Sequence, residues 1–180
     1  MLFCAIKGLH WHYSWRLWRL PLVQTYTRGS ITIGKDFVAC SDPRHNSIGV
    51  FQHVVLKTLR PEAKIAIGEN VGVSGAAISA AEKITIGNNV LIGSGALIID
   101  SDLHPVSAAE SNCEGSAVAR PVIIEDDVFI GARAILLKGV HIGRGATVGA
   151  GSVVPHDVPP SVVVGGNPAR VIGRKRKNIQ

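Results

Sequence analysis

Aliphatic side chains recur at every sixth position along the second half of the chain. The longest series contains six members: Ile124, Ile130, Leu136, Ile142, Val148 and Val154. Six residues of α-helix turn a side chain through about 600°, so successive members would point in different directions. Short strands joined by tight turns and coiled into a parallel β-helix instead bury every sixth side chain along one axis. The spacing therefore predicts an all-β fold, a parallel β-helix.

The same spacing occurs earlier in the chain, where a histidine interrupts it. Ile86, Ile92 and Ile98 continue the pattern, and six further residues lead to His104 instead of an aliphatic residue. Shorter copies lie at 67–73 and 31–34. Because the walls of a solenoid are repetitive, we expect function to reside where the repeat is interrupted.

The spacing also divides the chain, which we expect to be one domain over 1–180. The hexapeptide β-helix is expected over 65–154, after irregular early coils at 26–64. Residues 105–120 lack the six-residue spacing and are expected to project as a loop. Residues 155–180 form a C-terminal extension with a basic tail.

Residues 1–25 differ from the rest in their aromatic content. They combine three tryptophans near helical spacing with two arginines and a proline: Trp11, Trp15, Trp18, Arg16, Arg19 and Pro21. We expect an N-terminal helix that packs over the open end of the solenoid and ends near the proline. The alternative is peripheral contact of residues 1–20 with a membrane surface.

Composition fits a narrow aliphatic core. The 180 residues are 46% hydrophobic but only 5% aromatic. No run of 18 apolar residues and no signal-peptide pattern is present, so we expect neither a transmembrane helix nor export. The cysteines, Cys4, Cys40 and Cys113, are odd in number and form no Cys-x-x-Cys pair. Free thiols, a cytoplasmic location and no metal site are therefore expected.

The net charge of +6 is unevenly distributed. Five basic residues gather near the C-terminus: Arg170, Arg174, Lys175, Arg176 and Lys177. Such a tail is either solvated or in contact with the phosphates of a soluble cofactor. No nucleic-acid-binding motif accompanies it, and we expect no nucleic-acid partner.

Several segments resemble the hexapeptide-repeat acyltransferases. They include Asp-Leu-His-Pro at 102–105 and Asn-Pro-Ala-Arg at 167–170, with the repeat segments 84–93, 121–132 and 148–160. The resemblance is greatest to galactoside and maltose O-acetyltransferases and to O-acetyltransferases of bacterial surface polysaccharide biosynthesis. It implies a left-handed coil, acetyl-CoA as the acetyl donor, and a homotrimer with the donor in a slot between neighbouring subunits.

Acetyl transfer to a hydroxyl needs a base that takes the hydroxyl proton, and histidine suits this task near neutral pH. His104 lies at the foot of the expected loop, and the resemblance matches it to the family's catalytic histidine. Asp102, two residues earlier, shares a face with His104 in an extended segment and is a candidate to orient its ring. Asp100 is a second candidate. A backbone carbonyl, or a simple turn made by these aspartates, is the alternative.

The resemblance implies six contacts with coenzyme A. Gly131 and Ala132 lie in the turn that contacts the thioester, where a backbone N–H is the expected oxyanion donor. Three other positions match sites near the arm and phosphates of the coenzyme, namely Ala150, His156 and Arg170, and Arg174 or Lys175 is expected to replace a further family arginine. His156 replaces a lysine common in the family, and Arg174 stands beside Gly173, where a second family arginine falls. Arginine and lysine both pair with phosphate.

Acceptor contacts are expected from the coil that precedes the histidine. Ser74 and Glu82 lie near positions that carry polar side chains in galactoside-type enzymes, and Asp100 is a further candidate. The match to those positions is inexact, so the acceptor is expected to be a sugar or glycan precursor other than a simple galactoside.

Three other functions remain compatible with the sequence. N-acetylation of an amino sugar would keep the fold and the donor. A scaffold without catalysis would keep only the fold, although the intact 102–105 and 167–170 segments oppose it. A γ-type carbonic anhydrase would bind zinc through three converging histidines, and the typical pair five residues apart is missing.

Overall fold

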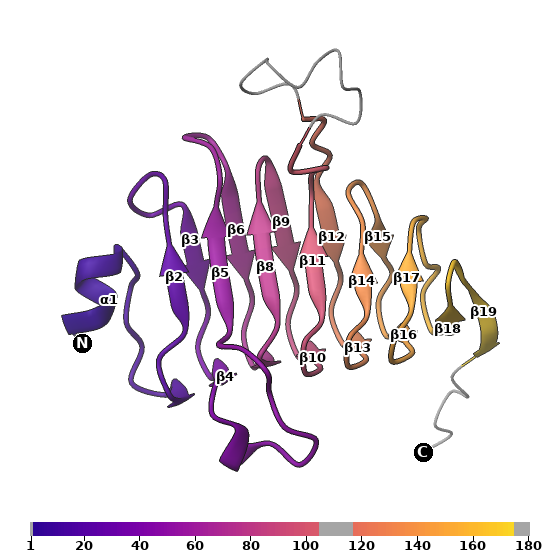
Figure 1. The fold of residues 1–180 in the computed structure, drawn as a ribbon, viewed down its shortest axis with the longest axis horizontal. Coiled ribbons are helices and arrows are strands. Elements are labelled where there is room, and N and C mark those ends of the chain that lie inside the picture. The colour runs from indigo at the N-terminus through magenta and orange to yellow at the C-terminus, as the bar shows by residue number, and fades with distance from the viewer. Residues whose placement is uncertain (1, 105–116, 175–180) are drawn as a thin grey trace.

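Three parallel sheets enclose one core in the computed structural model, which describes residues 2–104 and 117–174 (Figure 1). Each full coil contributes one short strand to each sheet, so neighbours within a sheet come from successive coils. The chain is therefore a parallel β-helix of triangular cross-section, as the six-residue spacing predicts.

The strands alternate regularly among the sheets. The eight-stranded sheet contains β1 (Arg16–Trp18), β4 (Val38–Cys40), β7 (Gly72–Ser74), β10 (Leu91–Ile92), β13 (Phe129–Ile130), β16 (Thr147–Val148), β18 (Val162–Gly166) and β19 (Ala169–Arg174). The six-stranded sheet contains β2 (Leu22–Gln24), β5 (Val55–Thr58), β8 (Ala77–Ala80), β11 (Leu97–Ile99), β14 (Ile135–Leu136) and β17 (Val153–Val154). The five-stranded sheet contains β3 (Ile31–Ile33), β6 (Lys64–Ile67), β9 (Lys83–Ile86), β12 (Val122–Ile124) and β15 (His141–Ile142).

The residues spaced by six form the core. Ile124, Ile130 and Leu136 lie in three different sheets, and each is at most 1% exposed. In the six-stranded sheet, Ile98 lies beside Leu136 in register, so like side chains stack from coil to coil. Because neighbouring coils share this core, no coil buries its apolar residues alone.

Three edges run along the solenoid where the chain passes from one sheet to the next. The first edge joins the eight-stranded to the six-stranded sheet and includes 93–96, 131–134 and 149–152. The second edge joins the six-stranded to the five-stranded sheet and includes 81–82, 100–104 and 137–140. The third edge returns the chain to the eight-stranded sheet. Coils approach closely at the first edge, where a Cβ on Gly131 would lie 2.5 Å from the backbone nitrogen of Ala150.

The N-terminal segment differs from the sequence-based prediction. Helix α1 spans only Leu2–Lys7, and the predicted helix through the three tryptophans is wrong. Trp18 belongs to β1, which pairs with β4, and the indole N–H of Trp15 donates to the carbonyl of Gly34 at 2.7 Å. Pairing with the next coil therefore outweighs the helical spacing of these residues. Across the described part of the chain, no helix is long and apolar enough to cross a bilayer.

The two remaining irregular segments lie outside the regular coils. After β4, residues 41–54 leave the solenoid at the first edge and include the 3₁₀ helix η1 (Pro43–His45). At the C-terminal end, β18 and β19 form an antiparallel hairpin, whereas the other named strands of the described residues pair in parallel. Most of the predicted loop at 105–120 and the end of the basic tail lie outside the described residues.

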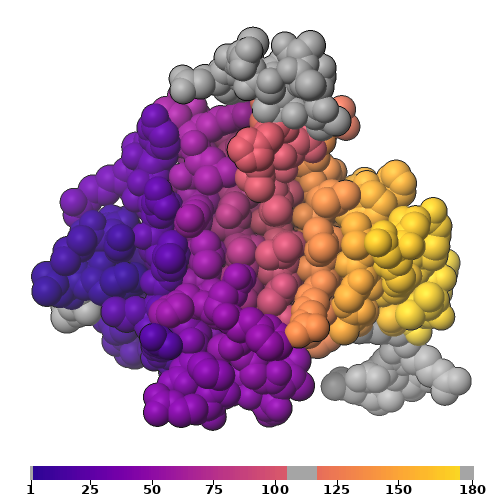
Figure 2. Space-filling model, viewed as in Figure 1, coloured from indigo at the N-terminus to yellow at the C-terminus, as the bar shows by residue number. Residues whose placement is uncertain are grey.

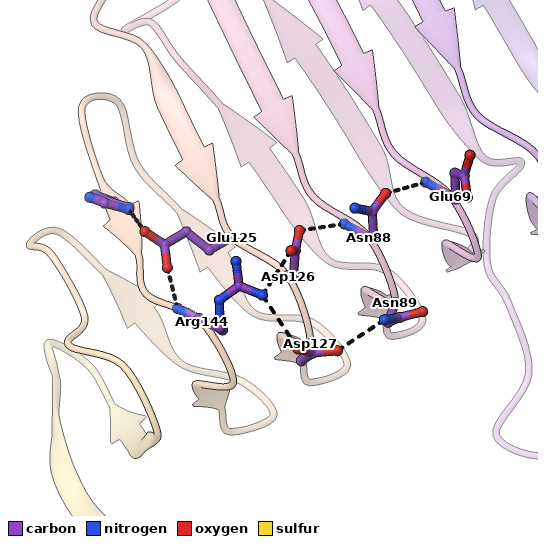
Figure 3. A network of polar contacts seen from close by, with 8 residues as sticks. Glu69, Asn88, Asn89, Glu125, Asp126, Asp127 and Arg144 are labelled. Atoms are coloured by element: carbon purple, nitrogen blue, oxygen red, sulfur yellow. Dashed lines mark hydrogen bonds and ion pairs between the residues drawn. The ribbon is translucent and has the colours of Figure 1, made fainter.

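Polar side chains form a ladder along the third edge (Figure 3). The side-chain oxygen of Asn88 accepts the backbone N–H of Glu69 at 2.8 Å, and the backbone N–H of Asn88 donates to Asp126 at 2.8 Å. Glu125 accepts the backbone N–H of Arg144 at 2.7 Å, and Arg144 also pairs with Asp126 at 2.8 Å. These contacts join four successive coils.

Acid is expected to weaken this ladder. The backbone N–H of Arg144, followed by the side chain of His141, lowers the pKa of Glu125 from its ordinary value of 4.5. The backbone N–H of Asn88, followed by the Arg144 side chain, lowers the pKa of Asp126. A carboxyl with a depressed native pKa stabilises the fold above its unfolded pKa, and this contribution is lost as pH falls through the native pKa.

Thermal unfolding of the wild type and Glu125→Gln at pH 7 and pH 3 measures the effect. The variant should melt earlier at pH 7, and the difference should shrink at pH 3, below the ordinary pKa of Glu125. A difference of equal size at both pH values would contradict the assignment.

Candidate active site

His104 lies on the second edge, where the chain turns away from the solenoid. Leu103 has a left-handed backbone with φ of 62°, and the backbone N–H of His104 donates to the carbonyl of Asp102 at 2.7 Å. This turn leaves His104 exposed. The inward position suggested by the six-residue spacing is therefore wrong, because the coil ends at β11 before that position is reached. An exposed histidine is accessible to a substrate.

Asp102 pairs with a different partner from the one predicted. Its carboxylate binds the ammonium of Lys138, which lies on the next coil along the same edge. The two side chains are 25% and 27% exposed. Among the described residues, no contact joins this carboxylate to the His104 ring, so the predicted orienting contact is not formed in this structure. The ammonium holds Asp102 by charge attraction and a charge-assisted hydrogen bond.

The Asp100 carboxylate accepts hydrogen bonds from the backbone of the preceding coil. It is 0% exposed, and its carboxylate accepts the N–H groups of Ala81, Glu82 and Lys83 at 2.6, 2.7 and 2.7 Å. Both carboxylate oxygens are thus occupied and shielded from solvent. This placement contradicts the predicted contact between Asp100 and substrate, and equally a role in orienting His104. Glu82 is exposed at the same corner, where a ligand can reach it.

The predicted thioester turn lies on the first edge. The N–H of Gly131 donates to the carbonyl of Val148 at 2.7 Å, which contradicts its use as an oxyanion donor. The N–H of Ala132 has no acceptor within the described ranges, and its carbonyl accepts the N–H of Gly151 at 2.8 Å. Ala132 therefore offers the available donor in this turn.

The other predicted coenzyme contacts lie in different parts of the fold: Ala150 and Arg170 at or near the first edge, and His156 and Arg174 away from it. Within the hairpin, Arg170 pairs in register with Gly165. The Cα of Gly165 lies 3.7 Å from the point where a Cβ added to Gly149 would be, and Gly149 directly precedes Ala150. The structure therefore brings Arg170 close to the first edge. Arg174 is exposed at the end of β19, and His156 is exposed on the second edge after β17. The predicted acceptor residue Ser74 ends β7 on the first edge, apart from Glu82.

One chain does not bring the predicted base and the predicted thioester turn together. His104 lies on the second edge and Ala132 on the first, with the six-stranded sheet between them (Figure 1). About six residues separate neighbouring edges, which at ~3.3 Å per residue places them roughly 15–20 Å apart. A site that uses both residues needs a second copy of the chain.

Sequence reasoning missed Lys138 and Arg60, which contact the chain at Asp102 and at Ala117. Lys138 binds Asp102 across 36 residues of sequence, and the Arg60 guanidinium donates to the carbonyl of Ala117 at 2.7 Å. Neither contact has a local sequence signal, because it depends on which coils become neighbours. Within residues 2–104 and 117–174, no three His, Cys, Asp or Glu side chains are grouped as a metal site requires.

Sequence comparison matches the repeat region of the chain. Residues 83–101 and 121–155 match the family described as "Hexapeptide repeat of succinyl-transferase". An 88-residue stretch is 48% identical to 2,3,4,5-tetrahydropyridine-2,6-dicarboxylate N-acetyltransferase of Staphylococcus aureus strain bovine RF122 / ET3-1. The match covers 49% of this chain and 32% of that protein, so the chain spans about a third of this relative's length.

Structural comparison extends the similarity over nearly the whole chain. A hexapeptide-repeat-containing acetyltransferase from Vibrio cholerae O1 biovar eltor, solved with acetyl coenzyme A, has a TM-score of 0.62 and 25% identity, covering 98% of this chain and 75% of its own. A maltose O-acetyltransferase from Clostridium difficile 630 has a TM-score of 0.57 and 26% identity, covering 91% and 71%. The chain thus carries the hexapeptide repeat and resembles the hexapeptide-repeat acetyltransferases in sequence and in fold.

Proposed function

We propose that this protein is an acetyl-CoA-dependent O-acetyltransferase that acts on a hydroxyl of a sugar or glycan precursor. The observation that carries the proposal is the exposed His104, which lies between the two matched hexapeptide-repeat segments, 83–101 and 121–155, at the edge where the chain leaves the solenoid. The match to a solved acetyltransferase bound to acetyl coenzyme A supports the choice of donor.

His104 acts as the general base in a direct transfer between the two substrates. Its ring takes the proton of the acceptor hydroxyl while the hydroxyl oxygen attacks the thioester carbonyl carbon. The N–H of Ala132 stabilises the resulting oxyanion. The tetrahedral intermediate then collapses, the carbon–sulfur bond breaks, and the sulfur leaves with the proton from His104. The products are an acetyl ester and coenzyme A.

Two copies of the chain supply these groups in a proposed homotrimer. The second edge of one copy, with His104, meets the first edge of the next, with Ala132, so each interface contains one site. The outer face of the six-stranded sheet supports such packing, because it carries a row of half-buried apolar side chains: Ala77, Leu97, Ile135 and Val153. We also infer the left-handed coil of the family. Light scattering tests the assembly, and a monomer mass in an active preparation would contradict it.

Acetylation of an amine is the second candidate. The 48% identity to an N-acetyltransferase favours it, although that match covers about a third of the relative. A base beside a nucleophile serves both reactions, so the fold does not decide between them. The chemistry of the product distinguishes the two reactions, because hydroxylamine cleaves an acetyl ester and leaves an acetyl amide intact. Mass spectrometry of the product before and after hydroxylamine treatment should show loss of the acetyl group. Retention of the acetyl group would favour acetylation of an amine.

Arg170→Ala is expected to raise the KM for acetyl-CoA several-fold more than the KM for the acceptor. The Arg170 guanidinium is exposed beside the first edge, where it can pair with a coenzyme phosphate. Initial rates with each substrate varied in turn measure the two constants. Arg16→Ala, an exposed arginine at the other end of the solenoid, is the matched control. A larger rise for the acceptor would show that the phosphate role is wrong.

A further inference from the structure

Helix α1 lies at the N-terminal end of the solenoid (Figure 1), and four large apolar side chains within residues 2–13 are exposed. We call these four residues the terminal patch. Their side chains are exposed to the following extents: Leu2 75%, Ile6 69%, Trp11 37% and Tyr13 86%. The opposite side of α1 is anchored, because Cys4 is 1% exposed and Phe3 packs against the core. The helix is thus held by one side while Leu2 and Ile6 point into solvent.

The terminal patch is not explained by the proposed catalytic site. Figure 2 shows the indigo N-terminal segment at one end of the molecule, with the yellow C-terminal hairpin at the other end. Arg170, predicted to contact the coenzyme, lies in that hairpin. Gathered exposed apolar residues mark interaction surfaces more often than scattered ones do.

Basic residues outnumber acidic residues around the N-terminal segment, where Asp36 lies beside Ser14 and its backbone N–H donates to the Ser14 hydroxyl at 2.7 Å. Residues 1–35 contain five Lys or Arg and no Asp or Glu, whereas the whole chain has 19 basic and 13 acidic residues. Lys7 belongs to α1, and the Arg28 guanidinium reaches the same helix, donating to the carbonyl of Ala5 at 3.3 Å. Within the described residues, Lys7, Arg16 and Arg28 have no acidic partner. Their charge is available to an anionic ligand.

We propose that the terminal patch binds the surface of an anionic phospholipid bilayer. Leu2 and Ile6 enter the boundary between headgroups and acyl chains, and Trp11 and Tyr13 lie at the headgroup level, where amphipathic aromatic rings are stable. Lys7 and Arg28 pair with lipid phosphates. The six-residue α1 is too short to span the bilayer, so the contact is peripheral. This assignment stands independently of the acetyltransferase proposal.

Flotation of the full chain with lipid vesicles tests the assignment. The wild type should float with vesicles of equal parts phosphatidylcholine and phosphatidylglycerol, should not float with phosphatidylcholine alone, and should be released at high salt. Ile6→Ser should lower the fraction bound to anionic vesicles by about tenfold, because the apolar contact is lost. Ile48→Ser is the matched control, since Ile48 is 67% exposed on a different surface, and it should bind as the wild type does.

Three outcomes would overturn the assignment. They are no binding of the wild type to anionic vesicles, equal binding to both vesicle types, and equal loss in the Ile6→Ser and Ile48→Ser variants. A separate measurement of molar mass distinguishes lipid contacts from protein contacts. If Ile6→Ser changes the molar mass of the protein in lipid-free solution, the patch joins copies of the chain and the lipid proposal is wrong. Equal melting temperatures of the two variants confirm that both are folded.

Discussion

His104→Ala is expected to lower turnover by about 10²–10⁴-fold while the protein remains folded, the usual effect of losing a general base. The histidine is exposed and outside the core, so its removal leaves no cavity. The measurement is kcat for coenzyme A release, with the melting temperature taken on the same preparation. Binding of acetyl-CoA should change little, because the predicted thioester turn at Ala132 and the phosphate contact Arg170 lie at or beside the first edge.

His10→Ala is the matched control for this prediction. His10 is also exposed, but it lies near α1, at the N-terminal end of the chain. It should retain wild-type turnover. Equal activity of His104→Ala and the wild type would rule out His104 as the base, whereas equal losses in both variants would point to a general effect of losing a histidine.

Asp100→Ala is expected to lower the free energy of unfolding by about 2–5 kcal/mol. The substitution leaves three backbone N–H groups without their acceptor, and one of them, on Ala81, is buried. A buried unsatisfied donor costs about 1–3 kcal/mol, and the two part-buried donors add smaller amounts. Urea denaturation followed by circular dichroism measures the change.

Asp157→Ala provides the matched control. The Asp157 carboxylate is exposed and accepts one backbone N–H, that of His141, at 2.8 Å. Its loss should cost about 1 kcal/mol or less. If Asp100→Ala were as stable as Asp157→Ala but raised the KM of the acceptor, Asp100 would be a substrate contact after all and its structural role would be wrong.

The fold could be predicted from the sequence because one period controls it. Ile124, Ile130 and Leu136 enter three different sheets, so a spacing of six returns the chain to the core once per strand. The N-terminal segment could not be predicted in this way. The tryptophans match a helical spacing, but β1 pairs with β4 and this pairing decides the local structure. Local periodicity carries no information about a neighbouring coil.

The candidate site could be predicted in part. The interruption of the repeat located His104 at an exposed turn, although not at the inward position that the spacing implied. The roles of Asp100 and Asp102 depend on contacts with other coils, with the backbone at 81–83 and with Lys138. These partners lie 17 to 36 residues away in sequence, where spacing arguments do not reach.

The most direct test of the acetyltransferase proposal is coenzyme A release from acetyl-CoA with a panel of monosaccharides, disaccharides, amino sugars and nucleotide sugars. The proposal predicts that one acceptor class stimulates release, that the acetylated acceptor appears in equal amount, and that His104→Ala abolishes both. No stimulated release with any acceptor, together with no coenzyme A binding by calorimetry, would contradict it.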